Sequence, residues 1–235
     1  MNKLLRFPSQ YKLKIFSNVH QVSEQDRPYL ECAYQAWREA WLDVFHNKMG
    51  LNASLYSNDF SRQTYVMALF EKRECIGVAF MREVDFRSKI AVDDSYFRFW
   101  PEDILEELRI KHQKVMIASN FTITQAYRRN RSFEWKTLFF ALYKDFYNTL
   151  DAHLMITAAR KLRANEKLCY DVGGICWTRD VPYKSEGAQA TEELTDILFW
   201  RPHIEFSLLN PQLQKLREEI WRNFQREKQY ELLSA

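Results

Sequence analysis

The sequence lacks the cysteine pattern of a zinc site or of a disulfide-stabilised domain. It has 4 cysteines in 235 residues, and none of them belongs to a C-x-x-C motif or stands among histidines. Zinc sites and disulfide frameworks both need such residues at short, regular spacings. We therefore predict reduced thiols, most of them packed in the interior, and no metal site.

Long hydrophobic runs are missing as well. No apolar stretch comes near the roughly 20 residues that cross a bilayer as a helix. The N-terminal segment MNKLLRFPSQYKLKIF contains Arg6, Pro8 and Lys12, where a secretion signal needs an unbroken apolar stretch. The sequence therefore predicts a protein that spans no membrane and stays in the cytoplasm.

Neither sign of charge is in large excess. The 34 basic and 31 acidic residues give a formal charge of +3, too small to attract nucleic acid or an anionic membrane globally. With 46% apolar and 15% aromatic residues, the chain can bury one sizeable core. Because repeats and low-complexity linkers are absent, we predict one domain over residues 1–209, followed by a C-terminal amphipathic helix over 210–235.

Strand-like and helix-like segments alternate along the chain. Residues 64–86 form two β-rich runs around a charged turn, the pattern of an antiparallel hairpin, and Gly77 inside the second run indicates a bulge or a close backbone approach. Residues 51–63 and 180–195 are polar and irregular, as loops are. The other expected elements are strand 11–16, a helix from its N-cap Asp26 to Met49-Gly50, helix 101–112, strand 114–124, a helix from about Trp135, strand 152–159, helix 161–172 ended by Gly173-Gly174, a strand pair 197–200 and 203–209, and a helix from Asn210.

A basic turn between a strand and a helix is the sharpest local feature. The strand ends in Ser119-Asn120-Phe121-Thr122-Ile123, and Tyr127-Arg128-Arg129-Asn130-Arg131-Ser132 follows before the helix. Amides at a helix N-terminus carry partial positive charge, and arginines beside them can hold phosphate oxygens. The segment predicts an anion-binding pocket, with a solvated loop as the alternative. We predict no nucleic-acid partner, because no basic face extends beyond this turn.

The order of these motifs resembles the GNAT superfamily of N-acyltransferases. TYVMALFEKRECIGVAFMREVDF looks like the hairpin of the family's second and third strands. ASNFTITQAYRRNRSFEW looks like its fourth strand with the pyrophosphate turn, and ANEKLCYDVGGICW like its asparagine-to-tyrosine helix. The resemblance covers residues 12–177. It implies an α/β (α+β) fold with a central mixed, mostly antiparallel sheet that is flanked by helices.

The resemblance also implies where an acyl thioester would bind. It places Phe121, Thr122 and Ile123 along the pantetheine arm. It assigns Tyr170 as the acid that protonates the leaving thiolate, and it sets four residues of the basic turn near the phosphates: Arg128, Arg129, Arg131 and Ser132. The family turn usually contains glycines, and this one has none. Acyl-CoA and acyl carrier protein therefore both remain as donors.

Two subgroups look more similar, the acyl-homoserine-lactone synthases and the long-chain N-acyl amino acid synthases. Their pattern resembles DVFHNKMG, the polar loop, the hairpin and IASNF. Their glutamate position is Ile117 here and their arginine position is Asn120, so homoserine-lactone chemistry is not predicted. A general base then has to come from elsewhere. Glu83 or Asp85 at the end of the hairpin strand is a candidate, and Asn120 orienting the acceptor or a water chain is the alternative.

The sequence thus predicts transfer of a medium- or long-chain acyl group from acyl-CoA or acyl carrier protein to an amine of a small polar acceptor such as an amino acid. The alternative is a catalytically degenerate GNAT-fold module that binds a ligand or a protein through its C-terminal helix, which also leaves a homodimer open. Most aromatic side chains are expected in the core. The residues expected to line an acyl pocket are Phe97 to Trp100.

Overall fold

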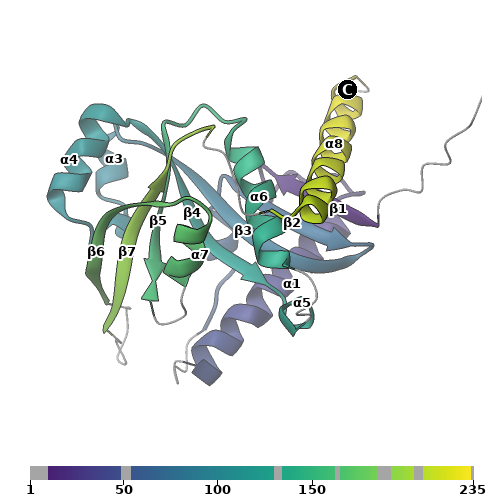
Figure 1. Ribbon diagram of the computed structural model, residues 1–235, viewed down its shortest axis with the longest axis horizontal. Helices are drawn as coiled ribbons and strands as arrows, with labels where there is room; N and C mark the ends of the chain where they lie inside the picture. The colour runs from purple at the N-terminus through teal and green to yellow at the C-terminus, as the bar shows by residue number, and fades with distance from the viewer. Residues whose placement is uncertain are drawn as a thin grey trace, which may run out of the picture.

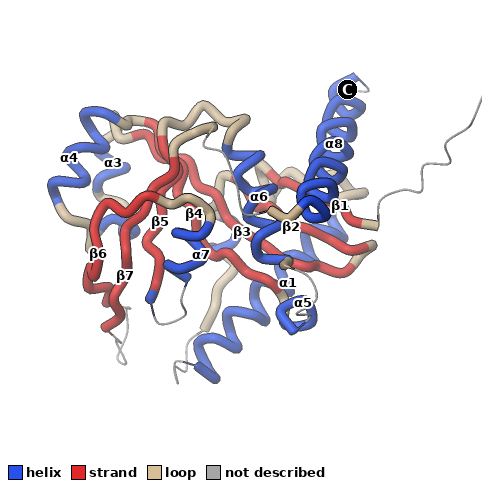
Figure 2. The backbone as a smooth tube through the Cα atoms, in the orientation of Figure 1, coloured by secondary structure: helices blue, strands red, loops and turns tan. Residues whose placement is uncertain are grey.

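A computed structural model describes residues 10–48, 54–129, 134–161, 165–184, 192–203 and 209–233. Within these ranges the chain is built around a seven-stranded sheet (Figure 2). The strands lie in the order β1-β2-β3-β4-β5-β7-β6. Their bounds are β1 Tyr11–Phe16, β2 Tyr65–Glu71, β3 Glu74–Asp85, β4 Lys114–Ile123, β5 Leu154–Arg160, β6 Ile175–Lys184 and β7 Glu192–Trp200.

Strand pairing confirms the predicted mixed, mostly antiparallel sheet. β4 and β5 are parallel, and every other neighbouring pair in the sheet is antiparallel. The parallel pair covers three positions, from Val115↔Leu154 to Ile117↔Ile156. Beyond Ile117 the ladder between β4 and β5 ends, although both strands continue. The sheet therefore opens at its centre.

Helices cover both faces of the sheet (Figure 1). Their bounds are α1 Arg27–Asp43, the π-helix η1 Val44–Lys48, α2 Asn58–Ser61, α3 Lys89–Val92, the 3₁₀ turn η2 Ser95–Phe97, α4 Glu102–Lys111, α5 Gln125–Arg129, α6 Trp135–Tyr147, α7 Asn165–Asp171 and α8 Pro211–Leu233. Among the described helices, none combines the length and the apolar character that crossing a bilayer requires.

Alternate residues of the central strands point to opposite faces, and this alternation divides the core. On one face α6, α7 and α8 pack over residues such as Met81 and Met116. On the other face α1 covers Phe80, while α3 and α4 cover Val84 and Val115. On β3 and β4, the side chains of neighbouring residues therefore reach the opening of the sheet from opposite faces.

The hairpin β2–β3 forms where it was predicted, and Gly77 confirms the expected close approach. A Cβ atom at Gly77 would stand 2.7 Å from the backbone oxygen of Thr122 and 2.8 Å from Ile123 Cδ1. Contacts that short are not tolerated, so only glycine lets β4 lie against β3 at this point. Gly77 thereby fixes the path of β4 next to the opening.

The prediction of the last strand pair was right for residues 197–200, which belong to β7, and wrong for their partner. The pair is β6 with β7, over Ile175–Lys184 and Glu192–Trp200, and the expected partner 203–209 lies mostly outside the described residues. β6 is one of the two edge strands of the sheet, and its polar sequence TRDVPYK resembles a loop. The prediction of a loop over 180–195 was therefore wrong for 180–184 and 192–195. β7 carries the buried polar residues Thr195 and Asp196. An edge position and buried polar side chains both weaken the apolar alternation that identifies a strand.

Two further expectations need correction, one about the start of the first helix and one about the loop that follows it. Asp26 precedes α1 but makes no side-chain capping hydrogen bond. Its carboxylate instead forms an ion pair with Lys14 Nζ, at 2.8 Å, and this pair connects the start of α1 to β1. The segment predicted as a loop contains the short helix α2. The expected helix end at Met49-Gly50 lies outside the described residues.

The C-terminal helix α8 packs on the domain itself. Its residues Leu213 and Ile220 are buried in the core beneath it. Arg217 forms a two-point ion pair with Asp145 of α6, and Glu227 accepts from Lys14 of β1 at 3.2 Å. Because these apolar residues are covered within the same chain, they are not a free docking face.

Candidate active site

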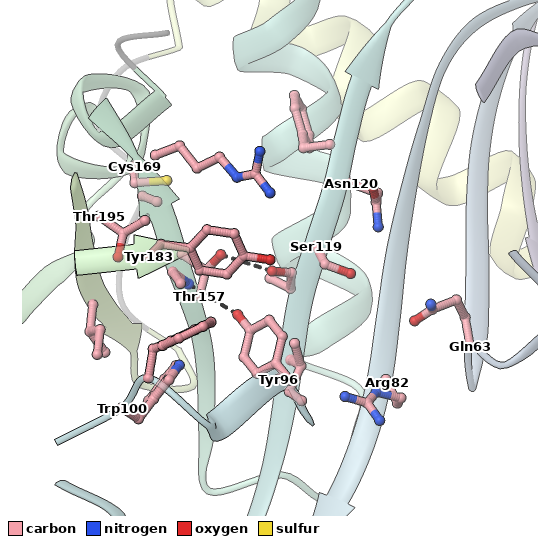
Figure 3. Close-up of a pocket in the computed structure, with 18 of the residues that line it drawn as sticks. Gln63, Arg82, Tyr96, Trp100, Ser119, Asn120, Thr157, Cys169, Tyr183 and Thr195 are labelled. Atoms are coloured by element: carbon pink, nitrogen blue, oxygen red, sulfur yellow. Dashed lines mark hydrogen bonds between the residues drawn. The ribbon is translucent and has the colours of Figure 1, made fainter. Parts of the chain in front are cut away.

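A cavity of about 530 Å³ runs through the opening between β4 and β5 (Figure 3). Residues from both faces of the sheet line it, so it joins the side of α1 and α4 to the side of α6 and α7. Its lining from the strands includes Ile117, Ala118, Ser119, Asn120, Phe121, Thr157, Ala158, Ala159 and Arg160.

A β-bulge in β4 shapes one wall of the cavity. The register with β3 passes from Val78↔Thr122 directly to Phe80↔Ser119. Asn120 and Phe121 are thus two residues opposite one, and Asn120 has a left-handed φ of 51°. A bulge of this kind frees backbone groups from the ladder and re-aims side chains, which is why bulges are common beside active sites.

Hydrogen bonds hold the inner edge of the opening. Thr157 Oγ1 of β5 donates to the carbonyl of Ala118 of β4 at 2.8 Å. The backbone N–H of Ala158 donates to the hydroxyl oxygen of Tyr96 at 3.0 Å. The Tyr96 hydroxyl therefore lies directly at the opening, as Figure 3 shows. Burial raises the pKa of Tyr96 to about 12, so the hydroxyl keeps its proton at neutral pH.

The side of the cavity next to α1, here called its polar end, carries a group of polar and charged residues beside aromatic ones such as Trp41. It is lined by Asn58, Asp59, Arg62, Gln63, Arg82 and Asp94. Arg82 and Asp94 form a two-point ion pair in which Nη2 donates to Oδ1 at 3.1 Å. Burial alone would raise the pKa of Asp94, but the hydrogen bonds from Arg82 and from the Tyr96 N–H, together with the charge of Arg82, lower it. Asp94 is held ionised, and its Oδ1 also accepts from the N–H of Tyr96 at 2.9 Å.

The opposite end of the cavity is aromatic and apolar. It is lined by Phe121, Phe140, Tyr143, Leu168, Cys169 and Trp200. The hydroxyl of Tyr143 donates to the carbonyl of Phe80 at 2.6 Å, which uses its proton inside the protein. Burial raises the pKa of the Cys169 thiol to about 12, so this thiol is protonated and unreactive at neutral pH.

No protein-family model matches the sequence, and no curated protein matches it either. Solved structures do match. FeeM, an N-acyl amino acid synthase from uncultured soil microbes, has a TM-score of 0.52 at 9% identity, over 81% of this chain and 89% of that chain. BjaI, a CoA-dependent acyl-homoserine lactone synthase, has a TM-score of 0.51 at 11% identity, over 89% and 88%. An agmatine N-acetyltransferase has a TM-score of 0.50 at 7% identity, over 81% and 99%.

The chain has the GNAT fold. The resemblance that the sequence motifs carried is thereby confirmed at the level of the fold. Identities this low carry no information about the substrates of this chain.

The GNAT motif residues divide between the cavity and its surroundings. Asn120 and Phe121 line the cavity. Thr122 is buried beside α1, where its hydroxyl oxygen accepts from Trp41 Nε1 at 3.1 Å, and Ile123 is buried in the core. Neither is among the lining residues, so of the predicted pantetheine segment only Phe121 presents its side chain to the cavity.

The basic turn of the GNAT motif is described only in part. Arg128 and Arg129 end the short helix α5 and are exposed, just before the described start of α6. Arg131 and Ser132 lie outside the described residues. The two described arginines are placed where an anion could reach them from solvent.

Tyr170 and Glu83 are not among the residues that line the cavity. The Tyr170 hydroxyl donates to Asp196 Oδ2 at 2.7 Å. Glu83 is exposed and accepts from the Tyr65 hydroxyl at 3.1 Å, on the sheet face opposite to Arg82. Strand alternation explains why Glu83 and Arg82 lie on opposite faces of the sheet. Arg82 points to the same face as Phe80 and Val84, and Glu83 points to the same face as Met81. Asp85 is paired with Arg87 instead.

The sequence did not single out Tyr96, Gln63 or Arg82. A weak signal was present for two of them. Arg82 is a charged residue inside an otherwise buried strand run, and Tyr96 precedes the Phe97 to Trp100 segment that was expected near a pocket. Of that segment, Phe99 and Trp100 line the cavity, as does Arg98, while Phe97 is in the core.

Proposed function

We propose that this chain is an N-acyltransferase that moves a medium- or long-chain acyl group from a phosphopantetheine thioester to the amine of a small polar acceptor. The observation that carries the proposal is the cavity through the opening of the GNAT sheet, whose lining combines a group of polar and charged residues with aromatic and apolar residues of the core under α6 and α7. A reaction between a polar amine and an apolar acyl chain needs both kinds of surface within one site.

The bulge of β4 would bind the thioester. Its backbone amides near Phe121 are candidates to donate to the carbonyl oxygen, where negative charge develops during attack. The acyl chain would extend over Phe140, Leu168 and Trp200 at the aromatic end. In this arrangement the thioester carbon lies in the opening, between the two ends of the cavity.

Proton movements complete the proposed reaction. The amine nitrogen attacks the thioester carbon, the C–S bond breaks, the nitrogen loses one proton and the thiolate gains one. The Tyr96 hydroxyl, at the opening and protonated, is placed to donate to the leaving sulfur. Tyr170, which the family resemblance assigns to this role, remains a second candidate. Asn120 lines the cavity and is proposed to orient the acceptor.

The donor would be held at its phosphates by the basic turn. Replacing both Arg128 and Arg129 by alanine is expected to weaken donor binding by about tenfold, because charge-assisted hydrogen bonds to phosphate are lost. The remaining affinity is expected to depend less on salt concentration. Native mass spectrometry and titration with decanoyl-CoA and with decanoyl acyl carrier protein measure this and separate the two donors.

A matched control is available on α8. Arg222 and Arg226 are exposed and one helical turn apart, so an Arg222→Ala, Arg226→Ala double variant removes the same charge elsewhere. It is expected to bind the donor as the wild type does. Failure of the wild type to bind either donor would overturn the acyltransferase proposal. Binding without any transfer would favour the degenerate GNAT-fold module.

A further inference from the structure

Gln63 has a buried acceptor atom that no described residue uses. The residue is 9% exposed and lines the polar end of the cavity. Its amide nitrogen donates to the backbone carbonyl of Asp59 at 2.7 Å. Only the nitrogen can donate to a carbonyl, so this bond fixes which end of the amide is the oxygen. Oε1 is buried and has no hydrogen-bond partner among the described residues.

A buried hydrogen-bond acceptor destabilises the protein unless a donor forms a hydrogen bond with it. Leaving a buried polar atom without a partner costs about 1–3 kcal/mol. The amide end of Gln63 points towards the cavity in Figure 3, on the same side of β4 as Arg82. A ligand that supplies an N–H group there would satisfy the oxygen.

Two ion pairs, each made of one arginine and one aspartate, lie in the same part of the cavity lining as Gln63. Arg62 Nη2 lies 3.0 Å from Asp59 Oδ1, and Arg82 is paired with Asp94. All four side chains line the cavity together with Gln63. A ligand with one positive and one negative group can interact with carboxylates and guanidinium groups at once. A purely cationic or purely anionic ligand would meet a like charge.

We propose that Gln63 Oε1 is the docking point for the amino group of the acceptor, and that the acceptor is a zwitterionic primary amine held between the Arg62–Asp59 and Arg82–Asp94 pairs. This inference rests on the proposed acyl transfer. The ammonium group first releases one proton to solvent, and the neutral amine then keeps one N–H directed at Oε1 while its lone pair faces the thioester in the opening. As the C–N bond forms and the C–S bond breaks, the nitrogen loses one proton and the thiolate accepts one.

The test uses Gln63→Met in the full chain. Methionine has nearly the same length and shape, but its sulfur is a weak hydrogen-bond acceptor. Thiol release from decanoyl-CoA and decanoyl acyl carrier protein is first measured with L-amino acids and with the amines that their decarboxylation gives. For the best of these probes, Gln63→Met is expected to raise the acceptor KM by about tenfold and to leave the donor KM unchanged.

Two further variants guard against a purely structural effect. Gln225 is exposed on α8, so Gln225→Met makes the same substitution outside the cavity and should behave as the wild type. Gln63→Glu retains acceptor oxygens and is expected to keep an acceptor KM much closer to that of the wild type. Thermal unfolding of each variant confirms that it is folded.

The outcomes separate the inference from the proposed function. An unchanged acceptor KM in Gln63→Met, with active wild type, would overturn the role of Gln63 and leave the acyltransferase standing. Decarboxylated amines that react as well as the amino acids would overturn the zwitterionic subsite. Absence of N-acyl product from the wild type with every probe would overturn both the inference and the proposed function.

Discussion

Replacement of Tyr96 by phenylalanine is expected to lower kcat by about a hundredfold while the KM for donor and acceptor changes little. The hydroxyl accepts from Ala158 N–H at 3.0 Å and lies at the opening between β4 and β5. Its raised pKa, about 12, keeps it protonated, so it can donate to sulfur as the C–S bond breaks. Loss of a positioned proton donor typically costs 10²–10⁴-fold, roughly, in rate. Steady-state kinetics with saturating donor measures the effect.

Tyr143 and Tyr170 provide the controls. Tyr143 also lines the cavity, but its proton is donated to Phe80 O at 2.6 Å, so Tyr143→Phe should destabilise the fold without a comparable loss of kcat. Tyr170→Phe should have a smaller effect on kcat than Tyr96→Phe, because its hydroxyl is bonded to Asp196. A large loss of kcat in Tyr170→Phe with normal kcat in Tyr96→Phe would return the role to the family tyrosine.

Replacement of Asp196 by asparagine is expected to lower the free energy of unfolding at neutral pH by about 2 kcal/mol or more, since it breaks a buried ionic network. Asp196 is 2% exposed. It accepts from Tyr170, from the N–H of Asp180 at 3.1 Å and from Lys161 Nζ at 3.1 Å. Burial alone would raise the pKa of Asp196, but these hydrogen bonds and the ammonium group lower it.

The sign of this shift predicts a pH dependence. A carboxyl whose pKa is lowered by folding stabilises the folded state above its unfolded pKa, about 3.9, and this contribution is lost as the pH falls through the folded pKa. The difference between wild type and Asp196→Asn should therefore shrink below about pH 4. Urea unfolding at neutral and acidic pH measures it.

Asp151 supplies the comparison for this experiment. It also has a lowered pKa, through a hydrogen bond from Lys114, but its side chain is 85% exposed. Exposed pairs contribute little to stability, so Asp151→Asn should unfold nearly as the wild type does. A difference between wild type and Asp196→Asn that stays constant from neutral to acidic pH would contradict the account of the Asp196 network.

The fold could be predicted from the sequence where the pattern of apolar residues was strong. The hairpin, β4 and the helices after it carry clear two- or four-residue spacing, and Gly77 marks a contact that a Cβ atom would block. The last strand pair could not be predicted in this way, because β6 lies at an edge and β7 buries Thr195 and Asp196. These two buried polar side chains take part in hydrogen bonds with residues far away in the sequence, and such bonds cannot be read from the sequence pattern.

Of the candidate site, only the residues that lie together in one continuous sequence motif could be predicted. Asn120 and Phe121 belong to the β4 motif and do line the cavity. Tyr96, Gln63 and Arg82 come from three different segments, and the fold alone brings them together. Glu83 was a reasonable candidate by composition, but strand alternation turns it to the opposite face. One residue of register is enough to exchange Arg82 for Glu83 at the cavity.

The most direct test of the central claim is to block the opening of the sheet and to look for N-acyl product by mass spectrometry. Ala158 lines the cavity from β5, so Ala158→Trp would fill the opening, whereas Gln25→Trp places the same side chain at an exposed position. The wild type and Gln25→Trp are expected to convert decanoyl thioester and amine into product, and Ala158→Trp, still folded, is expected to form none. Product formation by Ala158→Trp at the wild-type rate would contradict acyl transfer in the opening between β4 and β5.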